Sequence, residues 1–340
     1  MSGKRFTVAV IGATGAVGEA VLSVLFEREF PVAKLHAVSR DREEDETVLF
    51  AERPVELEEL DDFDFSSCQL AFFCAPAAVA KKHAPRAVKA GCWVIDVSQQ
   101  FRLKSGVPLA VPTVDSSVLE ALATEPRLIA SPGAPAVQLA TVLQPLAQQF
   151  GLRRVNVITV LSVSAKGRAG VNELAGQTAR LLNAQSFNSN SFPVQIAFNI
   201  IPAFDAPYES GYTHDEQGDA AELIKVLKQP RLKVSHSALF APVFYGHSQI
   251  VTVETERPVS IAGARAVLAK AADVDLAKAG AEKTTSIGMG TDSGSVVVGR
   301  VCQVEGEDHS LTLWTIADNI RKGAAVNAVQ IAETLLKSHL

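Results

Sequence analysis

The sequence predicts an α/β protein with two domains: an N-terminal Rossmann domain built on a doubly wound parallel sheet, and an α+β domain with a mixed sheet. The first part of the chain alternates short apolar strands with helical patterns, which is typical of a parallel sheet covered by helices. The second part contains longer strand-like runs separated by helical and hairpin-scale links. With 340 residues, each domain is large enough to bury a core of its own.

The predicted elements of the first domain follow in regular order. Short apolar runs rich in β-branched residues predict strands, and apolar residues at helical spacing predict the helices between them. One helix is expected to end at Gly91, because glycine is a common helix terminator. The predicted ranges are strands at 6–11, 34–38, 69–73 and 93–96, with helices at 19–26 and 79–90.

The second domain is expected to contain longer strands. The predicted ranges are strands at 154–163, 249–255 and 295–301, helices at 172–182 and 219–227, and a polar, proline-terminated loop at 184–193. The last segment again has helical spacing, and we expect it to return to the first domain. The predicted domains are therefore residues 1–133 together with the C-terminal helix 318–338, and residues 134–317.

Charge and cysteine content exclude several functional classes. The net charge is −5, and no run of lysine or arginine supplies the basic stripe that a nucleic-acid groove needs. Glycines and Glu19 interrupt the apolar stretch after Lys4 and Arg5, which argues against a signal peptide, and no segment has the roughly twenty apolar residues of a membrane span. The four cysteines lack metal-ligand spacing, so we expect no metal site and a reducing, cytoplasmic location.

A glycine-rich loop, Gly12-Ala-Thr-Gly15-Ala-Val-Gly18, follows the first predicted strand and opens the first helix. Glycines at such a turn let backbone N–H groups approach a pyrophosphate at the helix N-terminus. The loop predicts a dinucleotide site formed by Gly12, Thr14, Gly15, Ala16, Val17 and Gly18. The alternative is a glycine-rich turn that serves only packing.

The end of the second predicted strand favours NADP over NAD. NAD-binding proteins often place an acid there for the ribose hydroxyl, whereas this chain has Ser39 and Arg40, and a guanidinium suits a 2′-phosphate. The neighbouring acids Asp41, Glu43 and Glu44 weaken this prediction. The alternative for Arg40 is a solvated surface charge.

Six further segments combine with this loop into a family pattern. They are KAGCWVID at 89–96 (followed by Ser98 and Phe101-Arg102), VPLAVP at 107–112, GRAGVNEL at 167–174, QIAFN at 195–199 (followed by Pro202), YGHS at 245–248 and DNIRKGAA at 318–325. In order and spacing they resemble the sequence blocks of aspartate-semialdehyde dehydrogenases. The resemblance covers nearly the whole chain, which is identified as a divergent, usg-type member of that family.

The resemblance implies both a fold and a reaction. Members of this family convert β-aspartyl phosphate to aspartate semialdehyde with NADPH, through a thioester on a cysteine, and they are usually homodimers or tetramers. The resemblance therefore implies NADP, a homodimer, His247 as acid/base, Arg102 (with Lys82) as an anion-binding residue, and nicotinamide contacts from Cys74, Ala75, Asn319 and Gly323. The alternative for His247 is a structural histidine left from ancestry, and Cys74 is expected to be an inert buried thiol rather than a replacement nucleophile.

Several positions depart from the family's pattern. The family's nucleophile lies in an Asn-Pro-x-Cys turn, and the matching stretch, Ser131-Pro132-Gly133-Ala134, puts Ala134 at the cysteine's place. Removing the nucleophile of a covalent mechanism costs roughly a million-fold in rate. By the same resemblance, Leu161 replaces a supporting glutamine, Phe240 replaces the carboxylate-binding arginine, and Gly218 replaces a lysine whose neighbouring acid is Asp215. Loss of the arginine alone costs roughly 2–5 kcal/mol.

Two hypotheses of different classes follow, and both predict that the family's usual reaction is absent or very slow. In the first, the chain is an NADP-dependent reductase of an unknown carbonyl compound, which works by direct hydride transfer with His247 as the proton donor. Retention of the glycine-rich loop and His247 motivates it. In the second, the chain is a non-catalytic protein that binds nucleotide or another subunit, for example an active paralogue. The departures at Ala134, Leu161, Phe240 and Gly218 favour the second.

Overall fold

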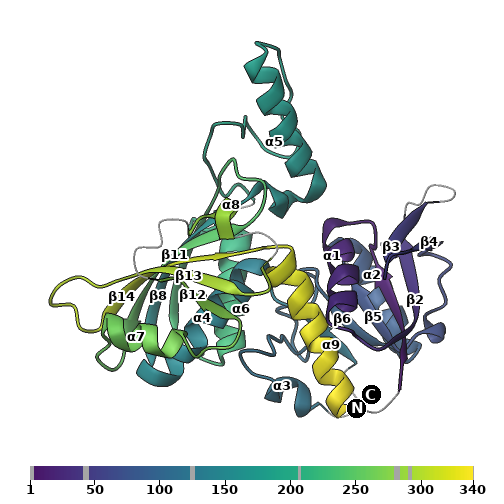
Figure 1. Ribbon diagram of the computed structural model, residues 1–340, viewed down its shortest axis with the longest axis horizontal. Helices are drawn as coiled ribbons and strands as arrows, with labels where there is room; N and C mark the ends of the chain where they lie inside the picture. Colours follow the sequence, from purple (N-terminus) through teal and green to yellow (C-terminus); the bar gives the residue numbers. More distant parts are fainter. Residues whose placement is uncertain are drawn as a thin grey trace. The chain divides into compact units, whose positions relative to one another are not determined.

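The computed structural model describes residues 4–40, 46–122, 127–205, 208–278, 284–289 and 293–339 (Figure 1). The chain forms two compact units, Met1–Gly133 with Ala324–Leu340, and Ala134–Gly323. The acids Asp41, Glu43 and Glu44 lie outside the described residues.

The first unit is built on a seven-stranded sheet in the order β3-β4-β2-β1-β5-β6-β7, in which all neighbours are parallel except β3 and β4. Its strands are β1 (Phe6–Ile11), β2 (Val32–Ser39), β3 (Thr47–Phe50), β4 (Arg53–Glu59), β5 (Leu70–Phe73), β6 (Trp93–Asp96) and β7 (Leu128–Ala130). Its helices are α1 (Ala16–Glu27), α2 (Ala77–Lys89), α3 (Ser117–Glu120) and α9 (Asn327–Ser338).

Both faces of this sheet are covered, as the continuous apolar strands predict. Successive residues Phe72 and Phe73 of β5 point to opposite faces, and both are fully buried. On one face, strand residues such as Phe72 join α1 and α9 in a single apolar cluster. The strand order reverses at β1, which has β2 on one side and β5 on the other. Nucleotides bind at such a switch point in open α/β sheets, beyond the carboxyl ends of the strands.

The second unit contains a seven-stranded mixed sheet in the order β12-β13-β14-β11-β8-β10-β9. Its strands are β8 (Leu152–Leu161), β9 (Ile201–Pro202), β10 (Lys233–Phe240), β11 (His247–Thr255), β12 (Val274–Leu276), β13 (Val296–Cys302) and β14 (Ser310–Ala317). Its helices are α4 (Ala134–Phe150), α5 (Gly167–Leu182), α6 (His214–Leu227), α7 (Ile261–Leu268) and α8 (Ser286–Met289).

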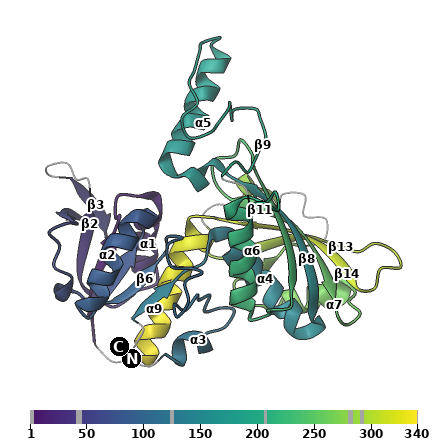
Figure 2. The same cartoon turned by 180° about the vertical axis from the view of Figure 1, so that it is seen from behind.

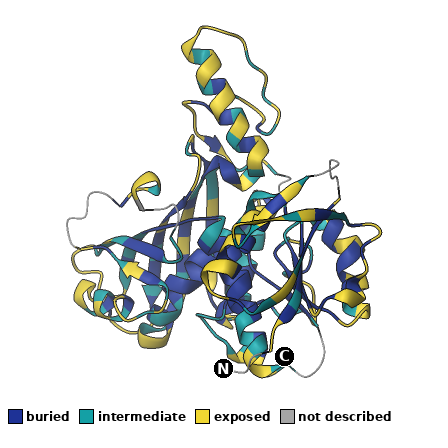
Figure 3. Cartoon of the chain, turned by 45° about the vertical axis from the view of Figure 1, so that its right-hand side comes forward, coloured by how far each residue is buried: buried dark blue, intermediate teal, exposed yellow. Residues whose placement is uncertain are grey.

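Helices cover one face of the second sheet and leave apolar residues exposed on the other. α4 packs against β8, β11, β13 and β14, α6 against β10, and α7 against β12 and β13. Ile158 of β8 and Ile250 of β11, a register pair, are 42% and 40% exposed. Figures 1 and 2 show α5 extending away from this sheet, and Figure 3 shows that most of its residues are exposed or half-buried.

The C-terminal segment differs from the single helix expected at 318–338. The Asp318 carboxylate accepts two backbone N–H groups of the turn that follows β14, and a π-helix over Arg321–Val326 precedes α9. Because of this turn the chain enters the first unit only at Ala324, so residues 318–323 belong to the second unit. In the part of the chain that the structure describes, no helix is long and apolar enough to cross a membrane.

Candidate functional site

The glycine-rich loop is shaped by contacts that only glycine allows. Gly12 has a φ of +80°, and a Cβ there would lie 2.8 Å from the carbonyl oxygen of Cys74 and 3.2 Å from the Cα of Ala75. A Cβ on Gly18 would overlap the carbonyl oxygen of Gly12, and a Cβ on Gly15 would lie 3.3 Å from it. The β1–α1 loop therefore packs directly on the loop after β5, and the first turn of α1 stays close to β1.

These two loops border a cavity of about 240 Å³ in the first unit. Seven of the predicted cofactor residues line it: Gly12, Thr14, Gly15, Ser39, Arg40, Cys74 and Ala75. Ala16 and Val17 are instead the first two residues of α1, where their backbone lies at the helix N-terminus. A cradle that Cβ atoms would fill, opening onto a helix N-terminus at the switch point, fits a dinucleotide.

The cavity also has apolar walls that no motif indicated. Leu60 and Val79 line it, and the backbone N–H of Leu60 donates to the carbonyl oxygen of Ser39 at 3.0 Å. Cys74 faces the same cavity, but burial raises the pKa of its thiol far above the usual range. A thiol that stays protonated is a poor nucleophile, which supports its interpretation as an inert cysteine.

Arg102 and Lys82, expected to share an anion, have separate partners in the described chain. Arg102 donates from Nη2 to the carbonyl oxygen of Val97 at 2.8 Å. Lys82 is mainly exposed and pairs with Asp61 at 2.6 Å. Their joint role in anion binding stays a prediction.

Asp96, at the end of β6, is a buried carboxyl group beside Arg102. Burial raises its pKa to about 6, although hydrogen bonds from Ser98 and the charge of Arg102 act in the opposite direction. A carboxyl whose folded pKa exceeds its unfolded value loses stability as pH rises between the two values. Ionisation of Asp96 is therefore expected to cost stability between about pH 4 and pH 6.

Asp96→Asn is expected to be insensitive to this titration. The difference in free energy of unfolding between the variant and wild type should increase by about 1–3 kcal/mol, in favour of the variant, from pH 4 to pH 7. The reason is that only the wild type has to ionise a buried group. Urea unfolding at both pH values measures the difference. A constant difference across this range would show that Asp96 ionises at its ordinary pKa.

In the second unit, His247 and Asn319 lie in one buried polar cluster, and their predicted roles toward substrate and cofactor stay predictions. The side-chain oxygen of Asn319 accepts the backbone N–H of Gly246 at 3.1 Å and the hydroxyls of Ser162 and Ser164 at 3.2 and 3.1 Å. His247 Nδ1 lies 3.2 Å from the backbone N of Ser162 and 3.1 Å from its hydroxyl. His247 is 2% exposed.

These contacts fix the tautomer of His247. Because the backbone N–H of Ser162 can only donate, Nδ1 must accept, and the proton of the neutral ring lies on Nε2. Burial lowers the pKa of His247 to about 3. No hydrogen bond from Nε2 is found within the described ranges. At neutral pH, His247 thus carries one N–H donor, on Nε2, and is neither an imidazolium acid nor a base through Nε2.

His247 is expected to titrate near pH 3. Its folded pKa lies below the unfolded value, so its contribution to stability is complete above about pH 6.5 and is lost as pH falls toward 3. Ring ¹⁵N chemical shifts of wild type, assigned by comparison with His247→Gln, follow the titration directly. A transition near pH 6.5 would mean that the cluster is hydrated and that His247 is available as an ordinary acid/base.

Ala134 begins α4 and is half-buried. The backbone of Gly323 packs on it, because a Cβ on Gly323 would lie 2.9 Å from the Cα of Ala134 and would overlap its Cβ. The fully buried Gln249 holds the next residue by donating to the carbonyl oxygen of Pro135 at 3.2 Å. Gln249 lies two residues after His247 in β11, so the first turn of α4 is tied to the strand that carries His247.

The other departures from the family pattern lie on this unit too. Leu161 and Phe240 are register partners at the ends of β8 and β10, and Phe240 is 4% exposed. Gly218 is on α6, where a Cβ would meet open space. Asp215 is the second residue of the same helix, and its backbone N–H donates to the carboxylate of Asp205 at 2.9 Å.

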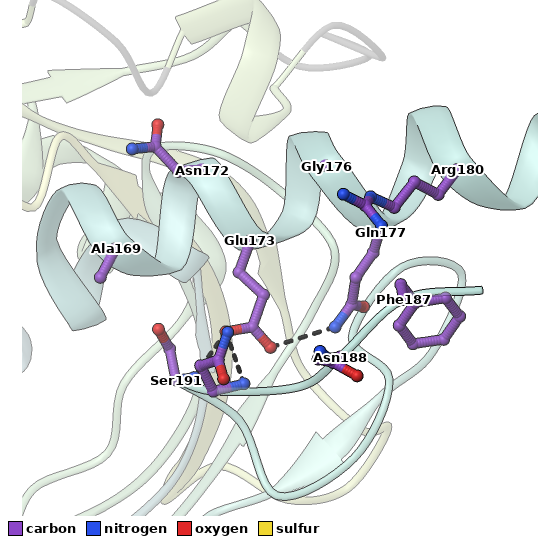
Figure 4. Close-up of a pocket in the computed structure, with 10 residues that line it drawn as sticks. Ala169, Asn172, Glu173, Gly176, Gln177, Arg180, Phe187, Asn188 and Ser191 are labelled. Carbon is purple, nitrogen blue, oxygen red and sulfur yellow. Dashed lines mark hydrogen bonds between the residues drawn. The ribbon is translucent and has the colours of Figure 1, made fainter. Parts of the chain in front are cut away.

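A second cavity, of about 380 Å³, lies along α5 (Figure 4). The Glu173 carboxylate accepts the backbone N–H groups of Asn190 and Ser191 and a hydrogen bond from Gln177, whose own side-chain oxygen accepts the N–H groups of Ile196 and Ala197. None of the predicted site residues lines this cavity. These bonds hold the long loop after α5. Glu173 belongs to the block GRAGVNEL, and the backbone N–H groups of Ile196 and Ala197 belong to the block QIAFN.

Comparisons with known proteins cover both units. Residues 7–122 match the family model described as semialdehyde dehydrogenase, NAD binding domain, and residues 143–322 match that described as semialdehyde dehydrogenase, dimerisation domain. The aspartate-semialdehyde dehydrogenase of Shewanella violacea is 39% identical over 336 residues, 99% of both chains. A protein of Pseudomonas aeruginosa named USG-1 protein homolog is 39% identical over 340 residues, again 99% of both.

Solved structures agree over the whole chain. The crystal structure of aspartate semialdehyde dehydrogenase II complexed with ASA from Vibrio cholerae has a TM-score of 0.95 at 39% identity, and the match covers 99% of this chain and 100% of that one. A probable aspartate-semialdehyde dehydrogenase from Pseudomonas aeruginosa has a TM-score of 0.94 at 38% identity, with the same coverage. The predicted fold class, a Rossmann-like domain followed by a mixed-sheet domain, is confirmed.

Proposed function

The chain belongs to the aspartate-semialdehyde dehydrogenase family, and on that premise we propose that it binds NADP but has lost, or nearly lost, the family's phosphorylating dehydrogenase reaction. The observation that carries the proposal is the alanine at position 134, which begins α4. A methyl group has no lone pair to attack a carbonyl carbon, so no thioester forms there.

The other candidate nucleophiles of the chain support this proposal. In the first unit, the thiol of Cys74 stays protonated, and the buried thiols of Cys68 and Cys92 contact each other at 3.1 Å. The hydroxyls of Ser162 and Ser164 are committed to Asn319, and His247 is too weak a base to activate them.

The cavity at the glycine-rich loop supports NADP as the cofactor. Gly12, Gly15 and the first turn of α1 would hold the pyrophosphate, and Arg40 the 2′-phosphate. When bound, the nicotinamide supplies a hydride. Calorimetry with NADPH and with NADH tests this assignment: micromolar binding that favours NADPH supports it, and absence of binding means that the loop is only structural.

We also propose that the protein is a homodimer formed through the second unit. The family model that matches residues 143–322 is described as a dimerisation domain. The helix-free face of the second sheet carries the exposed pair Ile158 and Ile250, and exposed apolar patches often mark interfaces. Light scattering on the purified protein, with Ile250→Lys as the variant, tests it: the variant is expected to be monomeric.

Direct reduction of a carbonyl compound is a second candidate, which the geometry of His247 favours. The Nε2–H group, held by the backbone of Ser162, can donate a hydrogen bond to a carbonyl oxygen and so polarise its carbon without becoming charged. The alkoxide that hydride transfer forms then takes its proton from water, because the neutral His247 is not an acid. Oxidation of NADPH by a panel of aldehydes and ketones, lost in His247→Leu, supports this candidate. NADPH binding without any turnover leaves the non-catalytic role.

A further inference from the structure

His247, Leu161 and Phe240 lie in one row across three adjacent strands, β11, β8 and β10. Phe240 pairs with Leu161 in the β8–β10 register. Ser248 pairs with Val160 in the antiparallel β11–β8 register, so the preceding residue, His247, is level with Leu161. Side chains that are level across a sheet point to the same face, and neighbouring strands lie about 4.8 Å apart. The Cα atoms of His247 and Phe240 are therefore about 10 Å apart, with Leu161 between them.

The far end of this row is aromatic. The ring centroid of Phe240 lies 5.3 Å from that of Phe192 and 5.4 Å from that of Phe204. Phe240 and Phe192 are buried, whereas Phe204 is 36% exposed. Leu161 packs against the same cluster. A ligand that extends from His247 along the row thus meets apolar side chains first at Leu161 and then at the aromatic cluster.

Lys166, at the aromatic end of the row, faces the rings of Phe204 and Phe240. Lys166 Nζ lies 4.8 Å from the ring centroid of Phe204 and 5.4 Å from that of Phe240. A carboxylate that paired with Lys166 would have to draw the ammonium away from both rings. Lys166 itself would offer the carboxylate a single point charge, without the fork of donors that makes an arginine a strong carboxylate ligand.

We propose that the His247 site takes uncharged carbonyl compounds with an aromatic or branched apolar substituent, and that it discriminates against those bearing a carboxylate. The carbonyl oxygen accepts the Nε2–H of His247, and the substituent lies over Leu161 against Phe204 and Phe240. This specificity rests on the proposed role of His247 toward a carbonyl oxygen, but it does not require turnover.

Calorimetry with two aldehyde probes tests the specificity on the full-length protein. The probes are 3-phenylpropanal and 4-oxobutanoate, and NADPH is titrated separately on the same samples. Wild type is expected to bind 3-phenylpropanal about 10-fold more tightly or better, because one buried apolar group contributes about 1–3 kcal/mol. Equal or tighter binding of 4-oxobutanoate would overturn the proposal.

Variants identify the residues responsible. Phe240→Arg and Phe204→Arg are expected to reverse the preference, whereas the matched variants Phe240→Leu and Phe204→Leu keep it. Phe204→Arg changes an exposed position, so it remains informative if Phe240→Arg does not fold. Lys166→Met is expected to leave 3-phenylpropanal binding unchanged within about 3-fold. If instead wild type binds 4-oxobutanoate preferentially and Lys166→Met abolishes that binding, Lys166 is a carboxylate site and the proposal is wrong.

The two titrations separate this specificity from the proposed function. NADPH binding with neither aldehyde bound refutes the aromatic subsite and leaves the cofactor assignment in place. Binding of 3-phenylpropanal without NADPH binding refutes the cofactor assignment and supports the subsite.

Discussion

Ala134→Cys is expected to form a thioester with an acyl phosphate, whereas the wild-type protein forms none. Position 134 is the half-buried first residue of α4, a helix of 17 residues. A helix N-terminus lowers the pKa of a thiol and so favours the reactive thiolate. Gly323 packs on position 134 through its backbone alone, because a Cβ there would overlap the Cβ of Ala134. Intact-mass measurement after incubation with acetyl phosphate detects the acyl adduct.

Ala134→Cys is expected to raise the steady-state rate of the dehydrogenase reaction less than it raises acylation. Wild type should oxidise aspartate semialdehyde, with phosphate and NADP, roughly a million-fold more slowly than the Shewanella violacea enzyme. Ala134→Cys should recover only part of this rate, because Leu161 and Phe240 still present apolar side chains to an acidic substrate. Ala134→Ser, similar in size but poorly nucleophilic, is the matched control. Turnover by wild type at the rate of that relative would refute the proposed loss of activity.

Gly12→Val is expected to weaken NADPH binding by about 100-fold or more. The new Cβ would lie 2.8 Å from the carbonyl oxygen of Cys74, so one of the two loops must move. A β-branched residue at a φ of +80° adds backbone strain of about 1–3 kcal/mol. Both effects displace the backbone N–H groups that would hold the pyrophosphate. Calorimetry with NADPH measures the loss.

Gly106→Ala is the matched control for backbone strain. Gly106 lies in the same unit and has a φ of +76°, but no atom lies within 4 Å of its Cβ position. The control should therefore lose some stability while it keeps NADPH affinity. If Gly12→Val binds NADPH as wild type does, the cavity at Gly12 is not the nucleotide site. If Gly106→Ala loses affinity equally, the effect of Gly12→Val reflects general destabilisation.

Local sequence patterns were sufficient for much of the first unit. The strand at 93–96 and the helix at 79–90 were predicted closely because their apolar spacing and terminators lie within the segments themselves. The hairpin of β3 and β4 was not predicted, because β3 has only four residues and β4 is mainly polar and largely exposed or half-buried. β10 and β14 were also missed. β10 (KVSHSALF) has no regular alternation, and its strand character depends on cross-strand neighbours in the mixed sheet. The alternation in β14 (SLTLWTIA) was available in the sequence and was overlooked.

The sequence by itself determined that position 134 carries no nucleophile and that a glycine-rich loop follows the first strand. Both conclusions follow from residue identity and local order. Only the tertiary structure decided that His247 is a neutral donor through Nε2, because its pKa and tautomer depend on burial and on the distant Ser162. Only the β8–β10–β11 register placed Phe240 in a row with His247. Contacts between residues far apart in the chain depend on how the strands pair, and no local pattern specifies that pairing.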